Sequence, residues 1–379
     1  MATAFTNATF VSPRGVVEGQ VMVVEGGLIR SFEMASPSGA EIVDCGGAMI
    51  VPGFIDLQVN GGGGVLFNDD PSVDAIATIA AVHRARGTTG FLPTLISDDL
   101  DVIATAVSAV DEAIASGIPG VLGIHIEGPF LNPKRKGIHD QTKLRALDAA
   151  GLDVIAGLKR GRTLVTLAPE CVQPDDIAEL VRRGVVVAAG HTEATHTQML
   201  RAFDNGLSAV THLFNAMAQI QPREPGTVGA ALTDPRCWCA IIVDGAHVDP
   251  VVLRLAIKAK GGEDRFVLVS DAMPIVGSGR TTFELDGRLI TAVDGVCRDA
   301  EGTLAGADLD MARAFSNAQR MLGIDVMTAS RMASGNPASM LGIGDTAGSL
   351  CPGRQADFAL LQDGGIVDVY LHGKQVLED

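Results

Sequence analysis

The middle of the chain alternates short apolar segments with amphipathic ones, and this alternation limits the fold more than any other feature. Amphipathic segments at 73–86, 100–116, 174–183, 195–205 and 249–260 have the spacing of helices. The apolar segments are typical of buried strands and number eight: 53–58, 89–94, 121–127, 163–167, 185–189, 209–212, 239–243 and 266–270. Eight strand–helix units over roughly 270 residues predict an α/β fold, a TIM-like (β/α)8 barrel, which usually has about 250 residues.

Both ends of the chain have a different pattern, rich in strands and poor in helices. Glycine pairs at 26–27 and 364–365 separate apolar segments in the manner of hairpin turns. We expect residues 1–51 and 349–379 to form one small β-sandwich domain, with the barrel at 52–348 inserted between them. Glycine-punctuated strands near 281–306 predict a β-hairpin insertion after the eighth barrel strand.

The composition excludes several kinds of partner. The chain has 45 acidic and 29 basic residues, a net charge of −16, so we expect no binding to nucleic acid or to membranes. No apolar run approaches the ~20 residues of a membrane span, and no signal peptide is recognisable. The six cysteines are scattered without a CxxC pair, which favours reduced thiols and a cytoplasmic location.

Polar side chains stand where several of the predicted strands end. Glu127 ends the third strand, His191 follows the fifth, His212 ends the sixth and Asp271 follows the eighth. A barrel brings all of these points to one face. One carboxylate and two imidazoles suit Zn²⁺ or a similar ion, which lowers the pKa of a bound water toward neutrality. Asp271 is then the natural general base, taking a proton from that nucleophilic water and returning it to the leaving group.

Several motifs resemble those of a known family. They are PGFID at 52–56, HIEGPF at 125–130, GHT at 190–192, THLFNAM at 211–217 and SDA at 270–272. Together they resemble the amidohydrolase superfamily and, more narrowly, the N-acetylglucosamine-6-phosphate deacetylase family. The HxEGPF and THLFNAM motifs are specific, and the resemblance extends over essentially the whole chain.

The resemblance implies a role for each matching residue. Glu127, His191 and His212 match the metal ligands, Asp271 matches the catalytic aspartate, and His139 matches a catalytic histidine at the acetamide carbonyl. The implied substrate contacts are Ile138, His139, Asn215, Ala216, Arg223, His247, Leu304, Ala305 and Gly306. Among these, Arg223 and His247 match the phosphate side. The resemblance also implies a homodimer in which Arg223 reaches the partner's site.

Strand one departs from the pattern of many amidohydrolases. It ends in Gln58-Val59-Asn60 instead of His-x-His, and the end of strand four has no lysine. We therefore expect one divalent ion per subunit, with Zn²⁺ as the first choice and Fe²⁺, Mn²⁺ or Co²⁺ also accepted by these ligands. Gln58 is expected to hold the water by a hydrogen bond.

Two further histidines lie outside the implied ligand set. His125 either orients a ligand from behind or is a core residue, and both alternatives stay open. His83 follows a helical pattern beside Arg84 and Arg86, so we expect it on a solvated surface.

The function implied is hydrolysis of the N-acetyl group of N-acetylglucosamine 6-phosphate, giving glucosamine 6-phosphate and acetate in amino-sugar catabolism. The first alternative is another amidohydrolase reaction on a different N-acyl or cyclic amide substrate, against which the Arg223 and His247 pair argues. The second alternative is a non-enzymatic barrel retained as a binding or scaffold protein. The complete set of metal ligands together with Asp271 argues against it.

Overall fold

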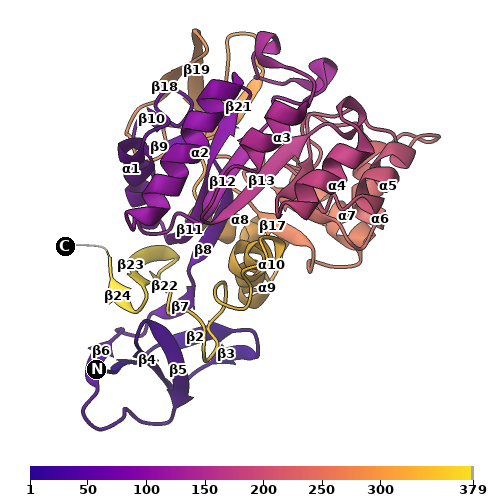
Figure 1. Cartoon of the computed structure of the whole chain (residues 1–379). Coiled ribbons are helices and arrows are strands. Elements are labelled where there is room, and N and C mark those ends of the chain that lie inside the picture. Colours follow the sequence, from indigo (N-terminus) through magenta and orange to yellow (C-terminus); the bar gives the residue numbers. More distant parts are fainter. Residues whose placement is uncertain (377–379) are drawn as a thin grey trace.

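The structure, a computed structural model, describes residues 1–376, and its centre is a parallel barrel. The eight strands lie in the order β17-β16-β15-β14-β13-β12-β11-β8, so sequential strands are neighbours (Figure 1). Their bounds are β8 Phe54–Val59, β11 Thr88–Ile96, β12 Gly123–Glu127, β13 Arg162–Leu167, β14 Val186–Ala189, β15 Ala209–Val210, β16 Trp238–Ile241 and β17 Phe266–Leu268. The predicted fold class is confirmed, and every predicted barrel strand has its counterpart.

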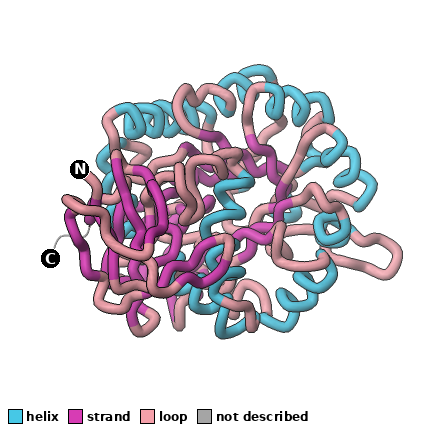
Figure 2. The backbone as a smooth tube through the Cα atoms, turned by 90° about the horizontal axis from the view of Figure 1, so that it is seen from below, coloured by secondary structure: helices cyan, strands magenta, loops and turns pink. Residues whose placement is uncertain are grey.

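Helices form the outer layer of the barrel and surround its strands when the molecule is viewed from below (Figure 2). Their bounds are α1 Val73–Arg84, α2 Leu100–Ala115, α3 Ala149–Ile155, α4 Pro174–Arg182, α5 His196–Asp204, α6 Gly226–Thr233, α7 Pro250–Lys260 and α8 Met311–Leu322. Local sequence sets several of their ends: the Ser72 side chain caps α1, and Gly261 ends α7 at a φ of 85°. No helix among residues 1–376 is long and apolar enough to cross a membrane.

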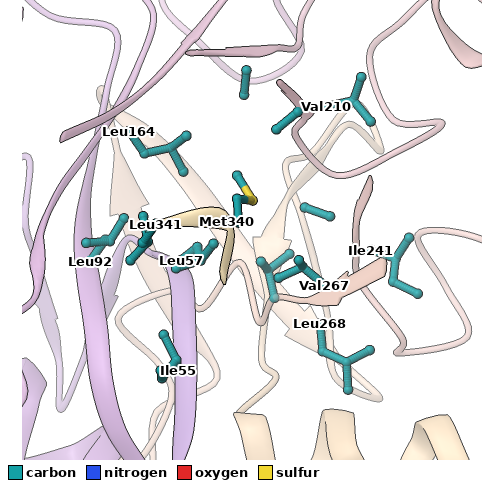
Figure 3. Close-up of a cluster of buried hydrophobic side chains, with 14 of the residues drawn as sticks. Ile55, Leu57, Leu92, Leu164, Val210, Ile241, Val267, Leu268, Met340 and Leu341 are labelled. Atoms are coloured by element: carbon teal, nitrogen blue, oxygen red, sulfur yellow. The ribbon is translucent and has the colours of Figure 1, made fainter. Parts of the chain in front are cut away.

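The lower end of the barrel is closed by apolar side chains. The chain here forms α9 (Val326–Ser330), the π-helix η4 (Arg331–Gly335) and α10 (Asn336–Met340). Met340 and Leu341 lie among strand side chains that include Leu57, Leu92, Leu164 and Val267 (Figure 3). Because this end is packed, an open site is left to the opposite end, where the strands have their carboxyl ends.

Two further sheets, built from both ends of the chain, lie below the barrel (Figure 1). One contains β1 Thr3–Thr6, β4 Val21–Glu25, β5 Leu28–Glu33 and β6 Glu41–Asp44; the other contains β2 Thr9–Ser12, β3 Gly15–Val17, β7 Met49–Pro52, β22 Phe358–Gln362, β23 Gly365–Leu371 and β24 Lys374–Gln375. Phe5 contacts Phe358 and Tyr370 edge to face across the core that the sheets share. The domain limits at 51 and 349 stay a prediction, and residues 377–379 lie outside the described part.

Two small sheets stand at the upper end of the barrel. β9 (Gly61–Gly62) pairs with β10 (Val65–Leu66) directly after β8. The segment expected as a hairpin forms a four-stranded antiparallel sheet instead: β18 Thr282–Leu285, β19 Arg288–Val293, β20 Val296–Arg298 and β21 Leu304–Ala307. Its last strand comes back to the barrel, because Ala307 pairs with Ala272 just after β17.

Candidate active site

Glu127, His191 and His212 converge at the upper end of the barrel. Glu127 ends β12, and the two histidines follow β14 and β15. Glu127 Oε1 lies 3.0 Å from His191 Nε2 and 2.9 Å from His212 Nε2, and the two Nε2 atoms are 3.1 Å apart. All three residues are at least 95% buried. The strand ends therefore place one oxygen and two nitrogen donors in a tight triangle.

This triangle has the chemistry of a divalent metal site. His191 Nδ1 lies 2.8 Å from the Arg135 carbonyl oxygen, which can only accept, so Nδ1 carries the proton and Nε2 keeps its lone pair. Burial opposes the charge of Glu127, but the imidazoles of His191 and His212 beside it hold its pKa well below the usual value. An ionised carboxylate beside imidazole nitrogens at these separations fits a bound ion with metal–ligand bonds of about 2.0–2.2 Å.

Asp271 lies beside this set, just beyond β17, and accepts from two side-chain amides, Gln58 in β8 and Asn60 directly after β8. Gln58 Nε2 donates to Asp271 Oδ1 at 3.0 Å and to Glu127 Oε2 at 3.1 Å. Asn60 Nδ2 donates to the same Asp271 oxygen at 2.8 Å. These bonds fix the Gln58 amide with Oε1 as its free end, and this buried oxygen has no protein partner. Gln58 thus offers a free acceptor at the site, and its role in holding a water stays a prediction.

The backbone is strained where these residues stand. His191, His212 and Asp271 have φ values of 50°, 33° and 51°, in the left-handed region that side chains other than glycine rarely adopt. Such conformations persist only where surrounding contacts hold them, and they cluster at functional sites. The strain is therefore consistent with a site whose side-chain directions matter more than local stability.

His139 is close to the triangle, but its tautomer suits hydrogen-bond donation and not metal binding. One ligand atom each from Glu127, His139 and His191 lie within 4.8 Å of one another. However, His139 Nδ1 accepts from the Ser97 backbone N–H at 3.3 Å and lies 2.7 Å from Ser97 Oγ. Burial and the neighbouring His191 hold the pKa of His139 well below its usual value, so the ring is neutral and its proton is on Nε2. A neutral N–H of this kind donates a hydrogen bond and does not bind a metal.

A cavity of about 460 Å³ opens over these residues. Its lining includes Glu127, His139, His191, His212, Asn215, Ala216, His247, Asp271 and the segment 302–306. Gly306, with a φ of 62°, crosses directly over Asp271: a Cβ at this position would lie 2.8 Å from the Asp271 carbonyl oxygen and 2.6 Å from Met273 Cγ. Only glycine fits here, which allows β21 to cover the site closely.

His247 enters the cavity from the loop after β16 and is held by Asp244. Asp244 Oδ2 lies 2.7 Å from His247 Nδ1, and Asp244 Oδ1 accepts from the backbone N–H groups of Ala246 and His247. Burial opposes the charge of Asp244, but the bond from His247 keeps its pKa below the usual value. An ionised carboxylate only accepts, so Nδ1 of His247 carries a proton.

Arg223 and His125 lie apart from the cavity. Arg223 is exposed on the loop before α6 and does not line the cavity of its own chain, so its action on a partner stays a prediction. His125 is buried below Glu127, with Nδ1 3.2 Å from Thr94 Oγ1 and Nε2 2.8 Å from Thr166 Oγ1, so both of its nitrogens are engaged in the barrel interior.

The expectation for His83 is wrong. Its ring is fully buried, and Nε2 lies 2.9 Å from the Gly61 carbonyl oxygen. The strand pair β9–β10 covers this face of α1, and the helical pattern of the sequence does not reveal that cover.

Sequence reasoning did not assign three residues that orient the site: Asn60, Ser97 and Asp244. The Asp-Gly-Ala-His spacing of 244–247 is a local turn signal that points to Asp244. Asn60 contacts Asp271 across the closure of the barrel, and Ser97 contacts His139 from the neighbouring strand end, so neither contact has a local signal in the sequence.

A barrel that gathers one carboxylate, two imidazoles and a further aspartate at the carboxyl ends of its strands has the arrangement of metal-dependent hydrolases. Comparison with known proteins places the chain within this class. The family model described as "Amidohydrolase family" matches residues 49–376.

Two curated relatives and one solved structure are informative. The chain is 41% identical to the N-acetylgalactosamine-6-phosphate deacetylase of Shewanella sp. (strain ANA-3), over 83% of this chain and 79% of that protein. It is 33% identical to the N-acetylglucosamine-6-phosphate deacetylase of Haemophilus influenzae, over 95% of both. The crystal structure of the N-acetylglucosamine-6-phosphate deacetylase from Pasteurella multocida superimposes with a TM-score of 0.95 at 32% identity, over 100% of both chains.

This chain belongs to the amidohydrolase family. Within that family it groups with the N-acetylhexosamine-6-phosphate deacetylases, which are hydrolases, so the resemblance seen in the motifs is confirmed.

Proposed function

We propose that the protein hydrolyses the N-acetyl group of N-acetylglucosamine 6-phosphate to glucosamine 6-phosphate and acetate. The observation that carries the proposal is the position of Asp271, which Gln58 and Asn60 hold beside the donor triangle at the floor of the cavity. N-Acetylgalactosamine 6-phosphate is the second candidate substrate, because the Shewanella relative is named for that sugar.

One divalent ion per subunit, with Zn²⁺ as the first choice, would be held by Glu127, His191 and His212. Such an ion supplies Lewis-acid chemistry, activating a water for attack and polarising the acetamide carbonyl. The free Gln58 Oε1 accepts a hydrogen bond from the attacking water and orients it. The end of β8 supplies the amides of Gln58 and Asn60 and no imidazole. Both amides donate to Asp271, and this arrangement supports a single ion.

Two residues of the chain act on the amide. His139 Nε2–H donates to the carbonyl oxygen and stabilises the negative charge that grows there during attack. Asp271 takes a proton from the water and then gives it to the nitrogen of the departing amine. The Ser97 bond keeps His139 in the donor tautomer throughout.

The phosphate would lie toward His247, and Asp244 sets the orientation of the His247 ring toward the phosphate. With Nδ1–H bonded to Asp244, Nε2 is left to donate to a phosphate oxygen when it is protonated. In Asp244→Asn the carboxylate that accepts from Nδ1–H is replaced by an uncharged amide, which is a weaker acceptor, so the ring is held less firmly and its bond to the phosphate weakens. We expect KM for the phosphorylated sugar to rise about tenfold or more, with kcat little changed. Steady-state kinetics on N-acetylglucosamine with and without phosphate check this, and an equal effect on both sugars contradicts it.

Arg223 would complete the phosphate site of a partner subunit in a homodimer. It stands between Pro222 and Glu224 on an exposed loop outside its own cavity, and an arginine fork suits phosphate oxygens. A two-fold interface makes the exchange reciprocal.

Mixing two inactive variants, Arg223→Ala and Asp271→Asn, tests the exchange. In a mixed dimer, one site has both normal residues and the other has neither. Random exchange makes about half of the dimers mixed, so we expect recovery to about a quarter of wild-type activity. Activity that stays at the level of the separate variants after proven exchange would place Arg223 outside the partner's site.

The location of the protein and its domain organisation complete the proposal. All six cysteines, which lie within the described residues, are unpaired, and this supports a cytoplasmic location. Residues 1–51 with 349–379 would form the small β-domain, supported by the shared core of Phe5, Phe10, Phe358 and Tyr370.

The proposed function is tested by measuring acetate release and metal content on the same preparation. We expect release from N-acetylglucosamine 6-phosphate that far exceeds release from the unphosphorylated sugar, with one ion per chain. The galactosamine epimer is assayed in parallel. A higher kcat/KM for that epimer would reassign the sugar, and no release from either phosphorylated sugar would overturn the proposal.

A further inference from the structure

The barrel has a seam between its first and last strands. β8 and β17 stand at the two ends of the strand order, and no continuous ladder joins them. Backbone pairing there is limited to Val59 opposite Ala272, with bonds from Asn60 N and Gly61 N to the Ala272 carbonyl oxygen at 2.9 and 3.1 Å. Below that point the seam needs other hydrogen-bonding partners.

A fully buried carboxylate, Asp56, occupies this gap. Asp56 Oδ1 accepts from Ser270 N at 3.2 Å and from Gln58 N at 3.3 Å. Asp56 Oδ2 accepts from the Ser270 hydroxyl at 2.5 Å. The side chain thus supplies Ser270 with the acceptor that a strand carbonyl would supply in a continuous ladder.

Ser270 links the residues before and after Asp271 by a hydrogen bond. Its hydroxyl oxygen accepts from the Ala272 backbone N–H at 3.2 Å. The residues on both sides of Asp271 are therefore held by one Asp56–Ser270 pair. Asp271 itself has a φ of 51°, and such a backbone needs external contacts to keep it in place.

The Asp56–Ser270 pair also contacts Gln58 of β8, whose side chain holds the Asp271 carboxylate. Gln58, whose backbone N–H donates to Asp56, donates its side-chain amide to Asp271. Burial raises the pKa of Asp56 to about 7, so its charge opposes folding and is offset only in part by these bonds. A buried carboxylate that serves stability alone is uncommon, whereas one that aligns two strands beneath a catalytic group has a role.

We propose that Asp56 and Ser270 are positioning residues that hold the base Asp271 in its working geometry across the barrel seam. The inference rests on the proposed function, in which Asp271 moves the proton. Neither residue lines the cavity, so neither contacts substrate. Their effect therefore falls on kcat and leaves substrate affinity and metal content intact.

Ser270→Ala tests the proposal with the loss of a single atom. Misplacement by a fraction of an ångström slows proton transfer, so we expect kcat to fall about tenfold or more, with KM within about twofold and one ion still bound. Ser334→Ala is the matched control. Ser334 is equally buried, and its hydroxyl donates to the Pro52 carbonyl oxygen at 3.2 Å on the lower side of the barrel.

The control separates a fall in stability from a fall in turnover. Both serine variants should lower Tm, Ser270→Ala somewhat more because it loses two hydrogen bonds instead of one, whereas only Ser270→Ala should lower kcat. Asp56→Asn keeps Oδ1 as an acceptor for both backbone N–H groups, so it should retain more activity than Asp56→Ala.

Three outcomes are distinct. Equal kcat values in Ser270→Ala and Ser334→Ala would overturn the positioning role while the wild type remains active. A KM rise or a metal loss that accounts for the whole effect of Ser270→Ala would overturn it as well. A wild type that releases no acetate from either phosphorylated sugar would overturn the proposed function, and this inference with it.

Discussion

Asp271→Asn is expected to bind the metal and the sugar phosphate normally and to lose more than about 10²-fold in kcat. The substituted amide keeps an oxygen at the Oδ1 position, so it still accepts from Gln58 Nε2 and Asn60 Nδ2. It cannot take a proton from water. The loss therefore reports the chemical step and not the architecture of the site.

A matched substitution shows that the effect belongs to this position. Asp310→Asn alters another buried aspartate, whose Oδ1 caps α8 by accepting from Arg313 N. Asparagine caps helices about as well as aspartate, and the ion pair that Asp310 makes with Arg86 is long at 3.6 Å, so this variant should keep its activity and lose little in Tm. Near-normal turnover in Asp271→Asn, with metal content unchanged, would mean that another group is the base.

The barrel was predictable because its signals are local and repeated. Each buried strand is an apolar segment bounded by turn residues, and each covering helix has its own amphipathic period. Segment 209–212 is instructive, because the structure keeps only Ala209–Val210 in the ladder and frees Thr211 and His212 for the site. The sheet at 282–307 was underestimated as a hairpin, since its two added strands, Val296–Arg298 and Leu304–Ala307, are too short to give a clear strand pattern.

Site residues were predictable to the extent that strand ends mark them. Glu127, His191, His212 and Asp271 lie together because parallel strands end at one face, although their catalytic roles stay predictions. His83 was misplaced because a helical pattern does not show which loop will cover the helix. The Asp56–Ser270 pair spans 214 positions in the chain and exists only once the barrel closes, so no local pattern indicates it.

The ligand triangle yields the other large effect. Replacing either histidine by alanine, His191→Ala or His212→Ala, removes one of three donors that lie within 3.1 Å of one another. Mutation of a residue that only supports a metal ligand typically lowers metal affinity by about 10- to 100-fold. The loss of a ligand itself should lower the affinity by more than that. We expect metal and acetate release to disappear together, while Tm measured without metal stays near that of the metal-free wild type.

Metal titration of the variants against wild type decides between one ion and two. His196→Ala removes a histidine outside the cavity and should keep the wild-type stoichiometry of one ion per chain. The single-ion expectation depends on Gln58 and Asn60, which place neutral amide side chains where two imidazoles would be needed to hold a second ion. Two ions per chain under limiting metal would contradict it. Retention of a full ion by His191→Ala and by His212→Ala would move the metal to donors other than this triangle.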